Sequence, residues 1–287
     1  MDTVFLTGAT GYVGKRLLIA LKQKGFKLKC LVRKAANIKD CELVYGDIKD
    51  KDLLEKSLKE VKIVIHLAAI TTILDQNISD VNVVGTKNLI EASKKNKVSL
   101  VIYISSTSAV SARDIYGKTK KQAEELISKS GLKYVILRPG VIYSKDSPFI
   151  LKIINLNKKI PFFAPIIGNG KYIINPAHID DVISAILSAV NNKNALNKTY
   201  YILGPKNIKF NYFIDTINKA YGIKRRKLHI PIVLCTLIAF ILEKLINKPY
   251  LTMSTINALK ANPNYSIEEA KKDLNYNPIS FQEGIKK

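Results

Sequence analysis

The sequence predicts an α/β protein with a doubly wound parallel sheet and a smaller C-terminal lobe. Three observations support this fold class. Short apolar runs rich in β-branched residues alternate with segments of helical periodicity, a glycine-rich turn follows the first run, and after about residue 143 prolines and glycines break the rhythm. Strands separated by helix-length segments must be joined by crossovers, which produce a parallel sheet covered by helices on both faces.

Six apolar runs are the expected strands. They are residues 4–6, 28–32, 43–45, 63–67, 100–104 and 134–137. A helix is expected directly after the first run, because Val13, Leu17 and Leu21 recur every four residues and therefore share one face. Gly25 is expected to end this helix.

The stretch TGATGYVG joins the first strand to the first helix and carries Gly8, Gly11 and Gly14. Glycine lets the backbone approach a pyrophosphate, and a helix N-terminus offers N–H groups and a positive dipole to the anion. The spacing differs from G-x-G-x-x-G, so the loop alone fits either a nucleotide site or an ordinary turn. Its place at the start of a long βαβ series favours the nucleotide.

The ends of the second and third strands indicate which dinucleotide would bind. An acidic residue after the second strand would bind both ribose hydroxyls and repel a 2′-phosphate, but the sequence has Leu-Val-Arg33-Lys34 there. This favours NADP over NAD, unless Arg33 is simply one more surface cation. Asp47, after the third strand, is expected either to touch the adenine or to cap the helix that begins near Lys51.

Composition limits the classes of partner and site. The net charge of +23 is spread over both halves of the chain, and the largest basic cluster is residues 224–227, so we expect no nucleic-acid face. Cys30, Cys41 and Cys235 lack metal-ligand spacing, which predicts no metal site and no disulfide framework. A reducing, cytoplasmic location is expected, since the N-terminus also shows no secretory signal.

The chain is expected to form two interleaved parts. Residues 1–143, with parts of 176–205, would form the dinucleotide-binding domain, and 144–287 would mainly form a substrate lobe. In that lobe, residues 230–242 carry no charge but are too short to cross a bilayer. We expect a buried helix there; peripheral membrane contact through 230–246 is the alternative. A homodimer is also left open.

Tyr116 and Lys120 suggest acid–base chemistry. They lie four apart at the start of a helical stretch, so both side chains project from one face, and a nearby ammonium would lower the phenol pKa toward neutrality. The run Ser105-Ser106-Thr107 follows the fifth strand, at the strand ends where ligands bind in open α/β sheets. Taken alone, Tyr-x-x-x-Lys also occurs by chance in many helices.

The motifs in combination resemble a known group of enzymes. They are TGATGYVG, HLAA (66–69), VNVVGTKNL (81–89), ISSTSAV (104–110), YGKTK (116–120), RPGVIY (138–143) and AHIDDVISAI (177–186). In this order they resemble the extended short-chain dehydrogenase/reductase superfamily, and within it the NAD-dependent epimerase/dehydratase group. The resemblance implies a Rossmann domain and runs nearly end to end.

The resemblance also implies roles for individual residues. Tyr116 and Lys120 would be the catalytic pair, with Thr107 as the catalytic hydroxyl and Ser106 as its substitute. Asn82 would support the site, while His66 and His178 would be structural. The residues that would contact the dinucleotide are Gly8, Thr10, Gly11, Tyr12, Val13, Gly14, Arg33, Lys34, Asp47, Ile48, Leu67, Ala68, Ala69, Ser105, Tyr116, Lys120, Pro139 and Val141.

These observations predict an NAD(P)-dependent oxidoreductase, or a sugar-nucleotide epimerase or dehydratase, that transfers a hydride between nicotinamide and the carbon of a small-molecule alcohol or carbonyl, and the motifs do not separate these outcomes. Only eight residues separate Thr107 from Tyr116, fewer than is usual in the sugar-nucleotide epimerases of this group, which argues against a large UDP-sugar. A non-catalytic dinucleotide sensor or assembly protein of the same fold is the competing hypothesis. The complete Tyr116, Lys120 and Thr107 set argues against it.

Overall fold

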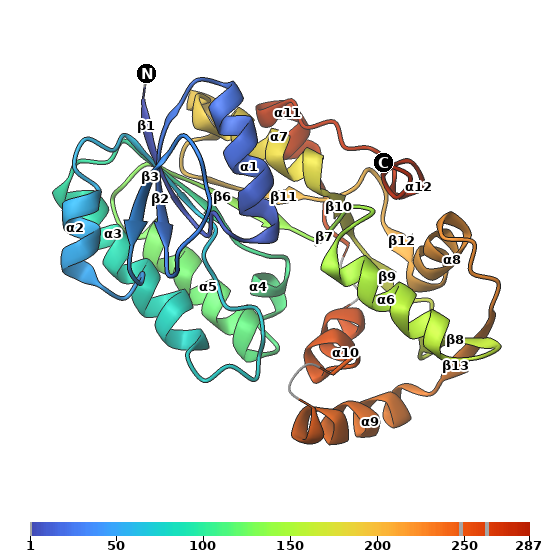
Figure 1. Cartoon of the computed structure of the whole chain (residues 1–287). Helices are drawn as coiled ribbons and strands as arrows, with labels where there is room; N and C mark the ends of the chain where they lie inside the picture. Colours follow the sequence, from blue (N-terminus) through green and yellow to red (C-terminus); the bar gives the residue numbers. More distant parts are fainter. Residues whose placement is uncertain (1, 247–248, 262–263) are drawn as a thin grey trace. The chain divides into compact units, whose positions relative to one another are not determined.

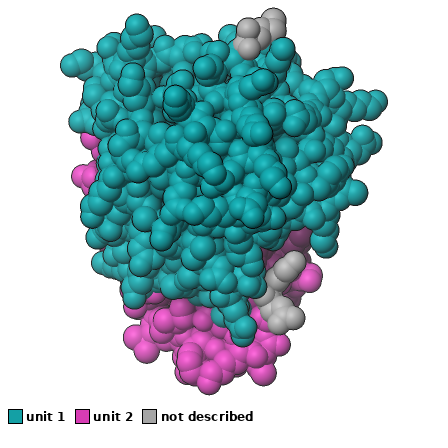
Figure 2. Space-filling view, turned by 90° about the vertical axis from the view of Figure 1, so that its left-hand side faces the viewer, with its two compact units in different colours: residues 1–139, 182–202, 268–276 teal, residues 140–181, 203–267, 277–287 magenta. Residues whose placement is uncertain are grey.

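The computed structural model describes residues 2–246, 249–261 and 264–287 (Figure 1). The chain divides into two compact units, coloured separately in Figure 2. Unit 1 contains residues 1–139, 182–202 and 268–276, and unit 2 contains residues 140–181, 203–267 and 277–287. Both units are therefore assembled from three separate stretches of chain.

Unit 1 is built on a seven-stranded parallel sheet with the strand order β11-β6-β5-β4-β1-β2-β3. The strands are β1 (Thr3–Thr7), β2 (Lys27–Val32), β3 (Glu42–Tyr45), β4 (Ile63–His66), β5 (Leu100–Ile104), β6 (Tyr134–Pro139) and β11 (Lys198–Ile202). This is the predicted doubly wound fold, and all six predicted strands are confirmed. The edge strand β11 has no counterpart among the six apolar runs, because Lys198 and Tyr201 interrupt the apolar pattern of its sequence KTYYI.

Helices cover both faces of this sheet. They are α1 (Tyr12–Gln23), α2 (Lys51–Ser57), α3 (Gly85–Lys95), α4 (Ser108–Ser111), α5 (Ile115–Ser128), α7 (Ile179–Val190) and α11 (Glu268–Leu274), with the π-helical turn η1 (Asp80–Val84) and the 3₁₀ turn η2 (Lys193–Ala195). Figure 1 shows α2, α3 and α5 on one face and α1 on the other. As predicted, α1 buries Leu17 and Leu21, and the chain leaves it through Gly25 in the left-handed region, at φ +82°.

Apolar residues from the sheet and its helices form the core of unit 1. Phe5 on β1 and Val64 on β4 are fully buried and pack with Leu54 of α2 and Leu89 of α3. A second cluster joins Tyr103 of β5 to Ala123 and other residues of α5. The carboxyl ends of β1 and β4 and the N-terminus of α5 are thus held by buried packing on the adjoining elements.

The described part of unit 2 is built from three strand pairs and five helices. The pairs are β7 (Val141–Tyr143) with β10 (Pro176–His178), β8 (Phe163–Ile167) with β13 (Arg226–Ile230), and β9 (Ile173–Ile174) with β12 (Ile208–Lys209). The helices are α6 (Pro148–Lys159), α8 (Phe210–Ala220), α9 (Ile232–Leu245), α10 (Met253–Lys260) and α12 (Phe281–Gly284). Its core packs isoleucines around a few aromatic rings, among which Phe281 stacks on Phe213 at 4.6 Å and meets Tyr143 edge-on at 4.8 Å between ring centroids.

The apolar stretch 230–242 forms most of α9, but the prediction that this helix is buried is wrong. Only Cys235 and Ala239 are buried, while Val233 and Leu245 are each more than three-quarters exposed. A helix that is apolar all round has no periodic signal for the side that faces protein, so its exposure could not be read from the sequence. Across the described ranges of the chain, no helix is both long and apolar enough to cross a bilayer.

Candidate functional site

The glycine loop between β1 and α1 is packed so tightly that side chains cannot be added. Gly8 has φ +76°, and a Cβ there would lie 2.8 Å from the Ala68 nitrogen. A Cβ on Gly14 would lie 2.1 Å from the Gly8 oxygen. Gly11 is the N-cap of α1, no side chain caps this end, and the first turn has no acidic residue. The helix therefore presents a positive end to whatever lies above the loop.

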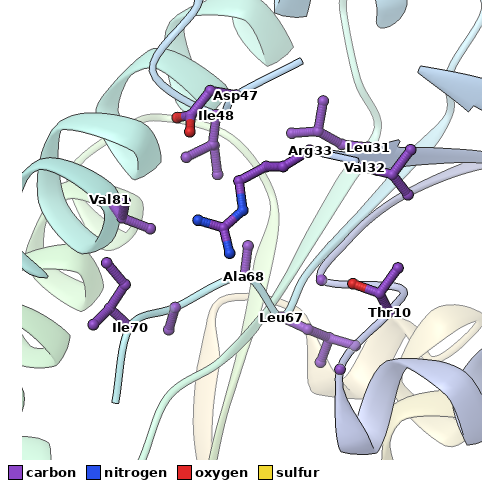
Figure 3. Close-up of a pocket in the computed structure, with 13 residues that line it drawn as sticks. Thr10, Leu31, Val32, Arg33, Asp47, Ile48, Leu67, Ala68, Ile70 and Val81 are labelled. Atoms are coloured by element: carbon purple, nitrogen blue, oxygen red, sulfur yellow. The ribbon is translucent and has the colours of Figure 1, made fainter. Parts of the chain in front are cut away.

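A pocket lies at the carboxyl ends of β1, β2, β3 and β4, where open α/β sheets bind ligands (Figure 3). Of the residues predicted to contact the dinucleotide, those that line it are Gly8, Thr10, Gly11, Arg33, Asp47, Ile48, Leu67, Ala68 and Ala69. The sequence analysis missed Leu31, Val32, Ile70 and Val81, which also line the pocket. These apolar side chains have no functional group that would mark them as ligand contacts. Leu31 and Val32 directly precede Arg33, Ile70 directly follows Ala69, and Val81 begins the motif VNVVGTKNL.

Arg33 and Asp47 face this pocket from neighbouring strand ends. Figure 3 shows the Arg33 side chain reaching into the pocket, with its guanidinium toward Ala68. The Asp47 carboxylate accepts a hydrogen bond from the Lys49 nitrogen at 2.9 Å. Asp47 does not cap α2, because Asp50 does so by accepting from the helix backbone at 3.0 Å, so that alternative is wrong.

The other residues predicted to bind the dinucleotide lie outside the pocket lining. Tyr12, Val13 and Gly14 belong to the first turns of α1, and Lys34 is an exposed residue after β2. Ser105, Tyr116, Lys120 and Pro139 also belong to unit 1, and lie on or next to β5, α5 and β6. Val141 belongs to unit 2.

Tyr116 and Lys120 lie one turn apart at the start of α5, against the end of β5. Asp114 caps this helix by accepting from the Gly117 nitrogen at 2.8 Å. Lys120 is 2% exposed; its Nζ donates to the Ile104 oxygen at 2.5 Å. The same Nζ lies 4.2 Å from the centre of the Tyr103 ring. Burial lowers the pKa of Lys120 to about 7.

Burial acts in the opposite direction on the phenol. It raises the pKa of Tyr116 to about 12, although a hydrogen bond with the Ser106 side chain opposes the shift. The expectation that Lys120 lowers this pKa toward neutrality is therefore wrong for this arrangement, in which the Lys120 Nζ bonds a backbone carbonyl. The Tyr116 hydroxyl is hydrogen-bonded to the side chain of Ser106. Thr107 is held through its backbone, since its nitrogen donates to the Pro139 oxygen at 3.0 Å.

Asn82 ties the loop after β4 to α5. Its Oδ1 accepts from the Ile70 nitrogen at 2.8 Å, and its Nδ2 donates to the Ile70 oxygen at 2.9 Å and to Thr119 Oγ1 at 3.1 Å. Thr119 in turn donates to the Tyr116 carbonyl at 3.0 Å. The buried Asn82 side chain, on the π-helical turn η1, thus joins one wall of the pocket to the backbone of the predicted catalytic helix.

His66 has a structural role, as expected. Its Nε2 lies 2.9 Å from Thr86 Oγ1, whose proton goes to the backbone oxygen of Asn82, so Nε2 carries the ring proton. Its Nδ1 then accepts from Thr7 Oγ1 at 2.7 Å, and Thr7 also accepts from the Ala68 nitrogen. Burial lowers the pKa of His66 to about 3, which keeps the ring neutral.

Ser105 indicates that the end of β5 faces a binding site. Its side chain is 4% exposed, and its Oγ has no hydrogen-bond partner among the described residues. A buried hydroxyl without a partner is costly in a folded protein, and such groups occur where a ligand or an ordered water completes the bonding. This hydroxyl and the glycine loop both fit a dinucleotide lying along the strand ends.

Comparison with known proteins identifies the family. The model of the NAD dependent epimerase/dehydratase family matches residues 4–204. The chain belongs to this family. The resemblance to extended short-chain dehydrogenases/reductases is thereby confirmed, and with it the prediction of an enzyme class that works with NAD(P).

The chain is similar to two curated proteins and to one solved structure of the same fold. The 3beta-hydroxysteroid-dehydrogenase/decarboxylase isoform 1 of Arabidopsis thaliana is 27% identical, over 86% of this chain and 65% of the plant protein. The 4-hydroxy-2-methyl-3-oxo-4-farnesyl-3,4-dihydroquinoline-1-oxide ketoreductase of Stigmatella aurantiaca is 24% identical, over 79% of this chain and 75% of its own. The UDP-glucuronic acid 4-epimerase of Bacillus cereus, solved with UDP-glucuronic acid and NAD, has the same fold, with a TM-score of 0.74, 23% identity, and coverage of 99% and 96% of the two chains.

Proposed function

We propose that this protein is an NADP(H)-dependent oxidoreductase that acts on a carbonyl or alcohol carbon of an apolar small molecule. The observation that carries the proposal is the group at the end of β5. Tyr116 is hydrogen-bonded to Ser106, Lys120 lies one turn further along α5, and the Ser105 hydroxyl has no partner among the described residues. A phenol among hydroxyls at a strand end is suited to hold the oxygen of a reacting C–O group.

When bound, the nicotinamide supplies or accepts the hydride. Tyr116 exchanges the proton of the substrate oxygen, and the hydroxyl of Thr107 or Ser106 orients that oxygen. A phenol with a pKa of about 12 carries its proton at neutral pH, so it is ready to donate in the direction of reduction. Lys120, whose Nζ bonds the Ile104 oxygen, would contact the nicotinamide side of the dinucleotide rather than change the pKa of Tyr116.

The dinucleotide would lie on the glycine loop, with its adenosine in the pocket that Arg33 and Asp47 line. The preference for NADP rests on Arg33, whose guanidinium can pair with a 2′-phosphate, and on Lys34 beside it. We place Tyr12, Val13 and Gly14 under the phosphates, and Lys120 and Pro139 toward the nicotinamide.

Two sets of observations support an apolar substrate and a membrane setting. Two relatives are named for hydroxysteroid and farnesyl-quinoline chemistry, and the segment between Thr107 and Tyr116 is short. The exposed helix α9 supports peripheral membrane contact through 230–246. The three free cysteines support a cytoplasmic location. No nucleic acid is part of the proposal.

Replacing Tyr116 by Phe tests the chemistry. Tyr116→Phe removes only the phenol oxygen, so the affinity for NADPH, measured by fluorescence titration, should stay nearly unchanged. NADPH oxidation with a panel of sterol and prenyl ketones should fall by at least about a hundredfold. Equal rates in the two proteins would refute the role of Tyr116, and a wild type that binds NADPH but turns over no carbonyl or nucleotide sugar would favour the sensor hypothesis.

Replacing Arg33 by Ala tests the choice of cofactor. Wild type should bind NADPH more tightly than NADH. Arg33→Ala should weaken the binding of NADPH about tenfold to a hundredfold, because a hydrogen-bonded ion pair is lost, and should leave the affinity for NADH unchanged. Lys24→Ala, which removes an exposed cation just after α1, is the matched control for net charge. Equal affinities of wild type for both cofactors would contradict the assignment.

A further inference from the structure

The most unusual surface of unit 2 is one side of α9. The side chains there are Val233, Leu234, Leu237, Phe240, Ile241 and Leu245, and we call this set the α9 stripe. Their exposed fractions run from 45% for Ile241 to 78% for Val233. The positions follow the helical repeat of three and four residues, so the six side chains form one continuous strip along the helix.

On α9 the small residues face the protein and the large apolar residues face outward, the opposite of an ordinary surface helix. The small residues Cys235 and Ala239 face inward and pack on Ile256 of α10, which Figure 1 shows beside α9. The helix's acidic group is turned away from the stripe, because Glu243 accepts a hydrogen bond from the Met253 nitrogen at 2.8 Å. Large apolar residues in such a row normally mark a surface that binds something.

A second exposed apolar group lies in the same unit, at the start of β8. Phe162 is 76% exposed and has φ +65°, a conformation that bulky residues rarely adopt. The next residue, Phe163, is 40% exposed and pairs with Arg226 of β13, which donates its backbone N–H to the Phe162 oxygen at 3.0 Å. Because β13 runs on into α9, the two phenylalanines and the α9 stripe lie at opposite ends of one strand pair.

Cations lie next to both apolar groups: Arg226 pairs with Phe163, and Lys244 lies against Phe240. Residues 224–227, the largest basic cluster of the chain, are all exposed and lead along β13 toward α9. The Lys244 Nζ lies 4.2 Å from the centre of the Phe240 ring, and the Lys152 and Lys159 Nζ atoms lie 5.7 and 5.8 Å from that of Tyr250. Unit 2 contains 17 lysines and arginines and 6 acidic residues, a net charge of +11.

We infer that the α9 stripe docks on the surface of a bilayer that contains anionic phospholipid. This deepens the membrane contact proposed above and does not depend on the redox chemistry. A helix of 14 residues is about 21 Å long, too short to span a hydrocarbon core of about 30 Å, so it lies in the plane of the interface. The stripe enters the acyl region, while the surrounding cations meet the headgroups.

Charge decides between a membrane and a second copy of the chain. Two copies joined through their α9 stripes would bring two like-charged cationic borders together, which is unfavourable. An anionic headgroup layer complements the same border. Lysines beside exposed aromatic rings are also typical of side chains that lie at the boundary between lipid and water.

Flotation of the full chain with lipid vesicles tests the inference. Wild type should float with vesicles of phosphatidylcholine and phosphatidylglycerol mixed at about two to one, far less with phosphatidylcholine alone, and less at high salt. The double variant Leu237→Gln/Phe240→Gln should bind the mixed vesicles about thirtyfold more weakly, since two half-exposed side chains lose their apolar contact. Lys224→Gln/Arg225→Gln should bind about thirtyfold more weakly through the loss of two charges.

Ile19→Gln is the matched control, because Ile19 is 56% exposed on α1 of unit 1. Its vesicle binding should equal that of wild type, and all variants should retain wild-type circular dichroism and NADPH affinity. Failure of wild type to float with the mixed vesicles would overturn the inference. So would equal binding by the stripe variant, or a stripe variant that instead dissociates a homodimer in light-scattering measurements. Tyr116→Phe should float like wild type, which separates this test from that of the chemistry.

Discussion

The buried ammonium of Lys120 makes the stability of unit 1 depend on pH. The pKa of Lys120 is about 7 in the folded chain, against 10.5 for the exposed group. Between these values the unfolded chain binds a proton that the folded chain does not, so the free energy of unfolding rises with pH. One pKa unit corresponds to about 1.36 kcal/mol, and the gain between pH 6.5 and 9.5 is about 3 kcal/mol.

Lys120→Met removes this dependence, because methionine keeps most of the apolar volume and has no proton to lose. Urea unfolding, followed by circular dichroism at pH 6.5, 8 and 9.5, gives the free energy of unfolding at each pH. From pH 6.5 to 9.5, the free energy of unfolding of wild type should rise by about 3 kcal/mol more than that of Lys120→Met. Lys118→Met, an exposed neighbour on α5, should follow wild type. Parallel pH curves for wild type and Lys120→Met would refute the claim that burial holds this pKa near 7.

Two further substitutions test how the catalytic helix is held. Gly117→Ala places a Cβ 2.5 Å from the Ser108 oxygen, so α4 or α5 must shift. We expect the free energy of unfolding in urea to fall by about 1–3 kcal/mol. The exposed Lys118→Ala is the control and should change it hardly at all. Asn82→Ala removes a buried amide that makes three hydrogen bonds, and should cost about 2–3 kcal/mol. Asn88→Ala, which removes one exposed bond, should cost less than about 1 kcal/mol; equal losses for both asparagines would contradict this account.

The sequence was most informative where one physical constraint dominates. Buried parallel strands need continuous apolar runs, so six of the seven strands of the main sheet were predicted, and β11 was missed because Lys198 and Tyr201 interrupt the pattern. The glycine loop was predictable because close packing at Gly8 and Gly14 excludes a side chain.

The remaining features depend on tertiary contacts that local patterns do not record. The spacing of Tyr116 and Lys120 predicts a shared helix face, but the pKa of each group follows from its burial and from its partners on β5. The exposed side of α9 was not predictable either, since the helix is apolar in every direction. Asp47 and Asp50 are equally good cap candidates by type, and only the backbone geometry distinguishes them.

The interleaving of the two units has a consequence for biosynthesis. The chain passes between them at residues 139/140, 181/182, 202/203, 267/268 and 276/277. Asp273 of α11 binds Lys198 and Tyr200 of β11, each at 2.7 Å, so the edge of the main sheet is stabilised by a residue that is made long after β11 itself. A ribosome must therefore release residues 268–276 before the nucleotide-binding half can finish folding, and a nascent chain halted at residue 202 would display an unsupported edge strand to chaperones.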